Sequence, residues 1–208
     1  ISLPWQKTED PRDSLHGNLQ LIDCDASKLT GRLLGKGHTW GGRLDTMVDY
    51  KAPVEKMTEL SVEGTLDIDR LATRNDPVLA ALARAGLPGL PAGGTLEVRG
   101  DLPRPGVEGR FEAGTLVLEA IELALPGTRL VAAGTAKADG GLALTCFAWT
   151  PEAKKVDLYR IGGTLDEPTV TPGDKIRDLG RPATRLLLRR EYAPLRTLFY
   201  ARHPRFDK

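Results

Sequence analysis

Apolar and polar residues alternate with a period of two along several segments of this chain, and this alternation constrains the fold more than any other feature. In the segment 60–69, one set of positions is apolar and the intervening set is polar or charged. Successive side chains of a β-strand point to opposite faces, so the alternation predicts a strand with one buried face. The pattern recurs at 40–49 and at 96–102, and we predict strands there too.

A short motif is superimposed on this alternation: a glycine, then Thr, Arg or Asn, then usually Leu. It begins at Gly17, Gly31, Gly42, Gly64, Gly94, Gly114 and Gly163, with a weakened copy at Gly134. The copies at 94, 114 and 134 are evenly spaced, and the spacing suits two strands and their turns. We therefore predict a meander of antiparallel hairpins, with glycines where the sheet bends.

The composition supports a sheet. The chain has 23 Gly and 15 Pro among 208 residues, which favours turns over long helices. We predict a mainly all-β fold, with a curled, groove-like antiparallel meander sheet over 1–172 and a helical or irregular basic tail over 173–208. The formal net charge is only +1, so the overall charge does not indicate nucleic acid as a partner.

One short helix is expected near 76–85. Asn75 or Asp76 is suited to the N-cap, Pro77 to the first turn and Gly86 to the C-terminal stop. Its apolar positions, which we expect to cover one face of the sheet, are Val78, Leu79, Leu82 and Ala85.

The segment 116–125 is apolar at both strand parities. Either a helix or loop covers its second face, as in many layered domains, or that face lines a groove for acyl chains. The residues leave both explanations open.

The tail after Lys175 is basic and rich in Leu, and Pro194 interrupts any single helix that would carry it. We expect its arginines to bind an anionic membrane surface or a protein partner. The residues selected for this role are Arg185, Arg189, Arg190, Arg196 and Arg202. The alternative is a solvated helix face that covers the end of the sheet. Nucleic acid is disfavoured because no stacking platform accompanies the charges.

No motif predicts catalysis, a cofactor or a metal site. The glycine-rich segment 31–37 is one residue too short for a phosphate-binding loop and lacks its hydroxyl residue, so we expect a bend between strands. The acidic pairs at 23–25 and 67–69 could ligate a hard metal, but each supplies few ligands, and a solvated strand face explains the pair at 67–69. His16, His38 and His203 lack zinc-site spacing. We therefore predict that the chain is not an enzyme.

The two cysteines and the N-terminus bear on the compartment. Cys24 and Cys146 could pair in an oxidising compartment or remain free thiols, and the sequence leaves both possibilities open. The chain begins with Ile, and its first residues have neither a basic nor an apolar signal region. We expect a native N-terminus upstream.

The stretch from Phe111 to Gly127, the glycine phrases at 134 and 140, and the closing run Tyr159-Arg-Ile-Gly-Gly-Thr-Leu-Asp-Glu-Pro-Thr-Val-Thr-Pro172 together resemble the C-terminal part of AsmA-like proteins. The likeness covers roughly 60–172, and the Ile-Gly-Gly-Thr-Leu-Asp-Glu-Pro run is its most characteristic piece. The tail after Pro172 departs from the family pattern, and we expect the family's N-terminal anchor to lie outside this chain.

The resemblance implies a periplasmic envelope protein, tethered to the inner membrane by a segment outside this chain, that acts in phospholipid transport or outer-membrane assembly. It also implies an apolar concave face. The residues expected to line that face and to hold acyl chains are Leu60, Val62, Leu66, Ile68, Leu96, Val98, Leu116 and Leu118. The chain is also similar to the type II secretion protein N family, which would make it a structural part of a secretion machine. A third possibility is a protein-interaction scaffold within a larger membrane complex, assembled through exposed sheet edges.

Overall fold

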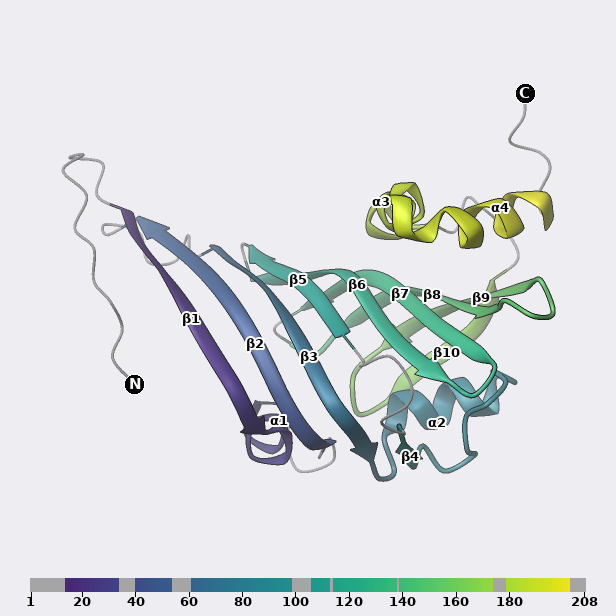
Figure 1. Cartoon of the computed structure of the whole chain (residues 1–208), viewed down its shortest axis with the longest axis horizontal. Coiled ribbons are helices and arrows are strands. Elements are labelled where there is room, and N and C mark those ends of the chain that lie inside the picture. Colours follow the sequence, from purple (N-terminus) through teal and green to yellow (C-terminus); the bar gives the residue numbers. More distant parts are fainter. Residues whose placement is uncertain are drawn as a thin grey trace.

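A computed structural model describes residues 14–33, 40–53, 61–98, 106–112, 114–137, 139–173 and 179–202. The described strands form one ten-stranded antiparallel sheet that curls without closing on itself (Figure 1). The strands are β1 (Ser14–Asp25), β2 (Trp40–Pro53), β3 (Ser61–Thr73), β4 (Leu96–Glu97), β5 (Gly106–Glu112), β6 (Thr115–Leu125), β7 (Thr128–Lys137), β8 (Leu142–Thr150), β9 (Lys155–Gly163) and β10 (Pro168–Gly173). They follow chain order across the sheet, except that β4 pairs with β3 off the main path. The predicted curled antiparallel meander is therefore confirmed.

Three glycines fall in one row across the sheet, and they explain how tightly it bends. Gly64 faces Gly109 on the neighbouring strand, and Gly134 follows two strands further along the same row. A Cβ at Gly109 would lie 2.8 Å from the carbonyl oxygen of Val117, and at the other two glycines it would lie even closer to the adjacent strand. The adjacent strands lie too close for any side chain at these positions. Gly64 and Gly134 belong to the predicted glycine motif, whereas Gly109 does not.

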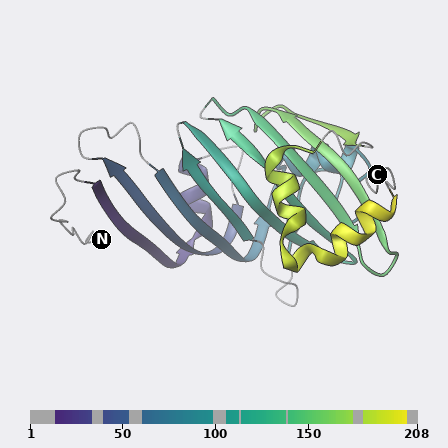
Figure 2. The ribbon, with the colours of Figure 1, turned by 90° about the horizontal axis from the view of Figure 1, so that it is seen from above.

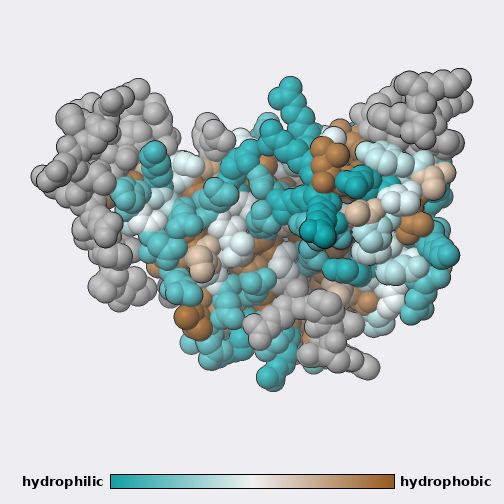
Figure 3. Space-filling view, turned by 45° about the horizontal axis from the view of Figure 1, so that its top comes forward, coloured by the Kyte–Doolittle hydropathy of each residue, from teal (hydrophilic) through white to brown (hydrophobic). Residues whose placement is uncertain are grey.

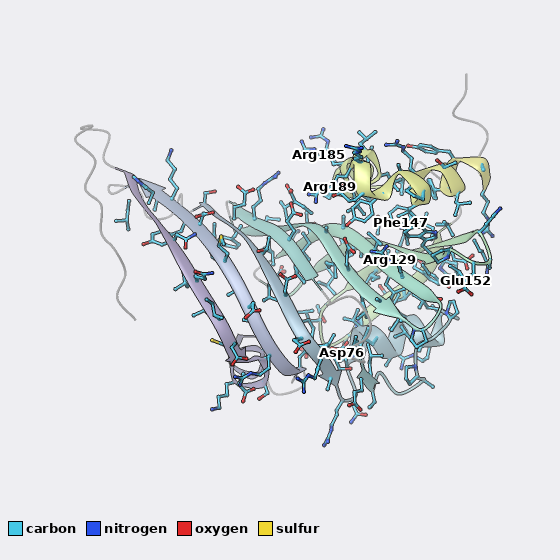
Figure 4. All side chains as sticks on the ribbon, in the orientation of Figure 1. Asp76, Arg129, Phe147, Glu152, Arg185 and Arg189 are labelled. Atoms are coloured by element: carbon cyan, nitrogen blue, oxygen red, sulfur yellow. The ribbon has the colours of Figure 1, made fainter. Side chains whose placement is uncertain are left out.

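Helix α2 (Pro77–Arg84) begins at Asp76 and fills one end of the concave side. The side chain of Asp76 accepts a hydrogen bond from the backbone N–H of Leu79 at 3.0 Å and another from Trp40 Nε1 at 2.9 Å. The cap therefore also ties the helix to β2, and Figure 4 places Asp76 beneath the sheet. Gly86, with φ of +87°, follows the last turn as the expected stop.

The larger hydrophobic core lies between the concave face and α2. It joins residues of β2, β3 and β6–β9 to Leu82 of the helix and Leu87 of the loop that follows. Val78, Leu79 and Ala85 pack against it, so the helix covers the sheet as its sequence predicted. This part of the curl is filled by the chain's own side chains.

The tail is helical and lies on the opposite, outer face of β6–β9 (Figure 2). It consists of α3 (Arg181–Leu188), the short 3₁₀ helix η3 (Arg190–Tyr192) and α4 (Ala193–Arg202). Pro194 lies in the first turn of α4, where the missing N–H costs nothing, so the predicted interruption is confirmed. A second core forms beneath these helices, and its largest buried side chains include Phe147, Leu186 and Phe199.

Two local features differ from the sequence expectations. Helix α1 (Ala26–Leu33) stands where only a bend between strands was expected, and its first turn is capped by Asp25, which accepts from Ser27. Of the strand predicted at 96–102, the described residues show only its first part: β4 at 96–97 pairs with Ala72 and Thr73 of β3, and Val98 lies outside the strand. Residues 99–105 lie outside the described part.

Candidate functional site

The concave face of the sheet keeps a partly exposed apolar surface at the end remote from α2. Strand register places Tyr50, Val62, Phe111 and Leu116 side by side in one row across β2, β3, β5 and β6. Leu15, Leu19 and Val48 lie on the same face on β1 and β2. We call this set the concave apolar row: Leu15, Leu19, Val48, Tyr50, Val62, Phe111 and Leu116.

None of the seven belongs to either hydrophobic core. Six are half-buried, and Leu116 is 37% exposed. Gly17 lies at the β1 end of the row, and a Cβ there would overlap the phenol ring of Tyr50. The ring therefore lies across β1 because that strand presents no side chain beneath it.

The outer face of the same strands is polar. Asp23 forms an ion pair with Arg43, and the hydrogen bond from Arg43 holds the pKa of the Asp23 carboxyl below its ordinary value. Asn18 donates to Asp49 at 2.9 Å. This part of the sheet thus carries charge on one face and apolar side chains on the other.

The structure divides the eight residues predicted to line an open apolar face. Val62 and Leu116 lie in the concave apolar row, and Leu66 packs against the larger core. Ile68, Leu96, Val98 and Leu118 are buried inside that core. For these four the expected open position is wrong, because they pack within the larger core, which also contains Leu82 of α2 and Leu87 of the loop after it. Leu60 lies outside the described residues.

Sequence reasoning missed most members of the row. Leu19 belongs to the first copy of the glycine motif, and Val48 was on the apolar side of its predicted strand, so both carried a usable signal. Tyr50 and Phe111 lie near strand ends next to charged residues, and only the register identifies their face.

Two of the five selected arginines, Arg189 and Arg202, hold the tail on the sheet. Arg189 donates to Glu108 at 2.6 and 2.8 Å and to Glu119 at 3.1 Å. Arg202 donates to the carbonyl of Val156 at 2.8 Å and to Asp157 at 2.9 Å.

Arg196 donates to the carbonyl of Leu187 at 3.2 Å, which joins α4 to the end of α3. Arg185 and Arg190 remain exposed. Three of the five selected arginines are therefore engaged within the molecule, which supports the alternative of a helical cover over the sheet.

Further polar contacts line the seam between the tail and the sheet. The Tyr192 hydroxyl donates to Glu122, and burial together with that contact raises the pKa of Tyr192. Arg129 donates to the same carboxylate at 3.1 Å, and its guanidinium lies 5.4 Å from the ring centre of Trp149. Acidic residues on the sheet thus meet basic and hydroxyl groups around the second core.

A cleft of about 290 Å³ opens between α3 and the outer face of β5–β7. The residues that give it its chemical character are Arg110, Glu119, Thr135, Arg181, Arg185 and Arg189. Arg110 and Arg189 both pair with Glu119. In Figure 4, Arg185 and Arg189 lie on the side of α3 nearest β5. Figure 3 shows that hydrophilic side chains dominate this face of the molecule around the helix.

Other chemistry is sparse in the described ranges. They contain no group of three or more His, Cys, Asp or Glu residues placed to hold a metal ion. Within them, no helix has the length and apolar character needed to cross a membrane. Cys24 and Cys146 are both free, and burial raises the pKa of Cys146 to about 12.

Searches against protein-family models, curated proteins and solved structures found no match to this chain.

Proposed function

We propose that the chain is a non-catalytic lipid-handling module of a bacterial cell envelope, acting in phospholipid transport or outer-membrane assembly. The observation that carries this proposal is the concave apolar row, which spans β1–β6 in register and lies outside both cores. An acyl chain laid along the row would hide apolar surface on both partners, at ~25 cal/mol per Å².

The arrangement around the row suits passive holding of a lipid. Helix α2 fills one end of the concave side, so a bound chain would lie at the opposite end. The outer face of β1–β3 is charged, which leaves the concave face as the apolar one. The resemblance to AsmA-like proteins points in the same direction, and with it come the proposed periplasmic location and the tether to the inner membrane.

Adjacent residues of β2 provide a matched test. Val48 belongs to the concave apolar row, whereas Met47 lies on the outer face and is 48% exposed. Val48→Asp should remove phospholipid that co-purifies with the protein, because a carboxylate in the row opposes an acyl chain. Met47→Asp should leave the lipid content unchanged. Mass spectrometry of extracted lipids and binding of fluorescently labelled phosphatidylethanolamine provide the readouts.

Leu116→Asp is a second variant of the concave apolar row, in case Val48→Asp misfolds. Leu116 is already 37% exposed, so a carboxylate there should disturb the fold little. It should also lower phosphatidylethanolamine binding while the melting temperature stays close to that of the unmodified protein. A folded Leu116→Asp variant that keeps its full lipid load would contradict the proposal.

The sheet edges favour a second candidate, a scaffold that adds a partner strand. Among the described strands β1 pairs only with β2, and its 12 residues contain no proline. The opposite edge, β10, is six residues long and contains Pro168 and Pro172. Prolines and short length protect an edge from pairing, so β1 is the edge suited to strand addition.

The two candidates separate experimentally. A scaffold should capture envelope proteins, including secretion components in the type II secretion protein N alternative, without bound phospholipid. Asn18→Pro on β1 should abolish such capture while leaving phosphatidylethanolamine binding intact.

A further inference from the structure

We propose that the arginine-lined cleft between α3 and the outer face of β5–β7 binds a phosphate group. The site consists of Arg181 and Arg185 on α3, Arg110 on β5 and the hydroxyl of Thr135 on β7. It lies on the face of the sheet opposite the concave apolar row, so it is independent of the proposed function.

The spacing on α3 gathers positive charge on one side of the helix. Arg181, Arg185 and Arg189 follow at intervals of four and form one row, while Ala183 and Leu187 face the second core. Like charges at this spacing oppose helix formation unless something compensates them. Glu108 and Glu119 compensate Arg189. Among the described residues, no ion pair or hydrogen bond engages the side chains of Arg181 or Arg185.

The N-terminus of α3 adds to the uncompensated positive charge. Its N-cap is Gly180, which offers no side-chain acceptor, and the first turn contains no acidic residue. The first backbone N–H groups of a helix and its dipole favour an anion, so Arg181 stands at the end of the helix that disfavours a cation. A bound anion would remove both conflicts at once.

The charge balance in the cleft also calls for an anion. Glu119 is the acidic residue lining it, and Arg110 and Arg189 already share its carboxylate. Two guanidinium groups therefore remain for a ligand. Their planar arrays of donors match the oxygens of a phosphate group, and Thr135 adds a hydroxyl donor.

The phosphate could belong to a lipid headgroup or to a free phosphorylated molecule. Leu188 is 64% exposed, and helical spacing places it beside Arg181 and Arg185. An apolar side chain next to the arginines suits a membrane surface, where it would enter the interface while the guanidinium groups contact headgroups.

The test compares two double variants: one removes two positive charges from the cleft, and the control removes two positive charges elsewhere on the surface. Arg181→Ala/Arg185→Ala changes exposed residues and should fold normally. The control, Arg190→Ala/Lys154→Ala, also removes two exposed positive charges, and neither residue lines the cleft. Binding is measured calorimetrically with inorganic phosphate at constant ionic strength, and by sedimentation with phosphatidylcholine vesicles with and without phosphatidylglycerol.

We expect the cleft variant to lose at least tenfold in affinity for one or both probes and the control to change less than twofold. Binding of inorganic phosphate without any preference for phosphatidylglycerol indicates a free phosphorylated ligand. Vesicle binding that Leu188→Ser weakens indicates a lipid headgroup. Equal affinities in the cleft and control variants, or no binding of either probe, would overturn the proposal. Val48→Asp should leave phosphate binding unchanged, which separates this result from the test of the lipid-handling function.

Discussion

Arg189 and Glu108 lie 81 positions apart in the sequence, yet both oxygens of the Glu108 carboxylate accept hydrogen bonds from the Arg189 guanidinium, at 2.6 and 2.8 Å. This paired geometry fixes the direction of the guanidinium as well as its distance. It joins the end of α3 to β5, at the border between the polar outer face and the second core. The tail is thus an integral layer over the sheet.

Docking of the tail should weaken in acid. The hydrogen bonds from Arg189 hold the pKa of Glu108 below its ordinary value in the folded protein. The stabilisation is therefore complete above the ordinary carboxyl pKa and is lost as the pH falls through the lower, folded-state pKa. The protection factors of the α3 and α4 amides, which compare measured exchange with the intrinsic rate at each pH, should fall on acidification. In Glu108→Gln this acid dependence should be smaller; an unchanged profile would show that the pair does not hold the tail.

Phe199→Ala should lower the free energy of unfolding by about 3 to 5 kcal/mol. Phe199 is 1% exposed, and its ring meets that of Phe147 edge to face, with 5.5 Å between the ring centres. Thr197→Ala, on the exposed side of the same helix, should change the value by less than about 1 kcal/mol. Urea denaturation measures both. Similar losses in the two variants would mean that the second core contributes little.

Gly134→Ala should destabilise the protein far more than Gly93→Ala. At Gly134 a Cβ would overlap the backbone of β8, whereas at Gly93 it would meet nothing within 4 Å. We expect a loss of about 1 to 3 kcal/mol at Gly134, of the size found for overpacked sites, and a change below about 1 kcal/mol at Gly93. Thermal unfolding followed by circular dichroism compares the two. A neutral Gly134 variant would show that the curl can relax.

Iodoacetamide should modify Cys24 in the folded protein and leave Cys146 unmodified. Cys24 is half-buried, whereas Cys146 is 2% exposed and burial raises its thiol pKa to about 12. The thiolate is the reactive form, so little of it exists at Cys146 near neutral pH. Intact-mass spectrometry should give one adduct in buffer and two in urea, and Cys24→Ser should lose the adduct formed in buffer. Modification of Cys146 at the same rate as Cys24 would contradict this burial.

The sequence predicted individual strands and helices better than it predicted which face of the sheet each helix covers. Alternation identified β2 and β3, and the punctuation by Asp76, Pro77 and Gly86 located α2, because these signals arise between neighbouring residues. The burial of Leu96 and Val98 depends on α2 folding back over the concave face, and no pattern in their own segment encodes that contact. For 116–125 the sequence left a covered second face and a groove-lining face both open, and the structure covers both faces for most of this strand. Leu118 enters the larger core and Ala120 the second core although they share one parity, because the strand register shifts between Leu118 and Ile121.

The candidate site was predictable only in part, for the same reason. Val62 and Leu116 each lie on an apolar face of their own predicted strand, so the sequence could select them. Tyr50 and Phe111 lie beside them on the same face of the sheet, which only the strand register shows. One wall of the arginine cleft could be predicted from the sequence, because Arg181, Arg185 and Arg189 are spaced by four residues and therefore lie on one side of a helix. Its other wall comes from Arg110 and Thr135, which the sheet topology supplies.

Helices cover some strands of the sheet on both faces and leave others less covered, and this difference should decide which strands unfold locally first. β6–β9 are enclosed between the larger core and the tail helices, whereas Figure 1 shows β1 and β2 extending away from the helices of both α2 and the tail. Backbone hydrogen bonds at that end have less packed material above and below them, so their amides should exchange with solvent first. The protein would then loosen from β1 inward, so that the end that bears the concave apolar row would change its shape while the rest stays folded.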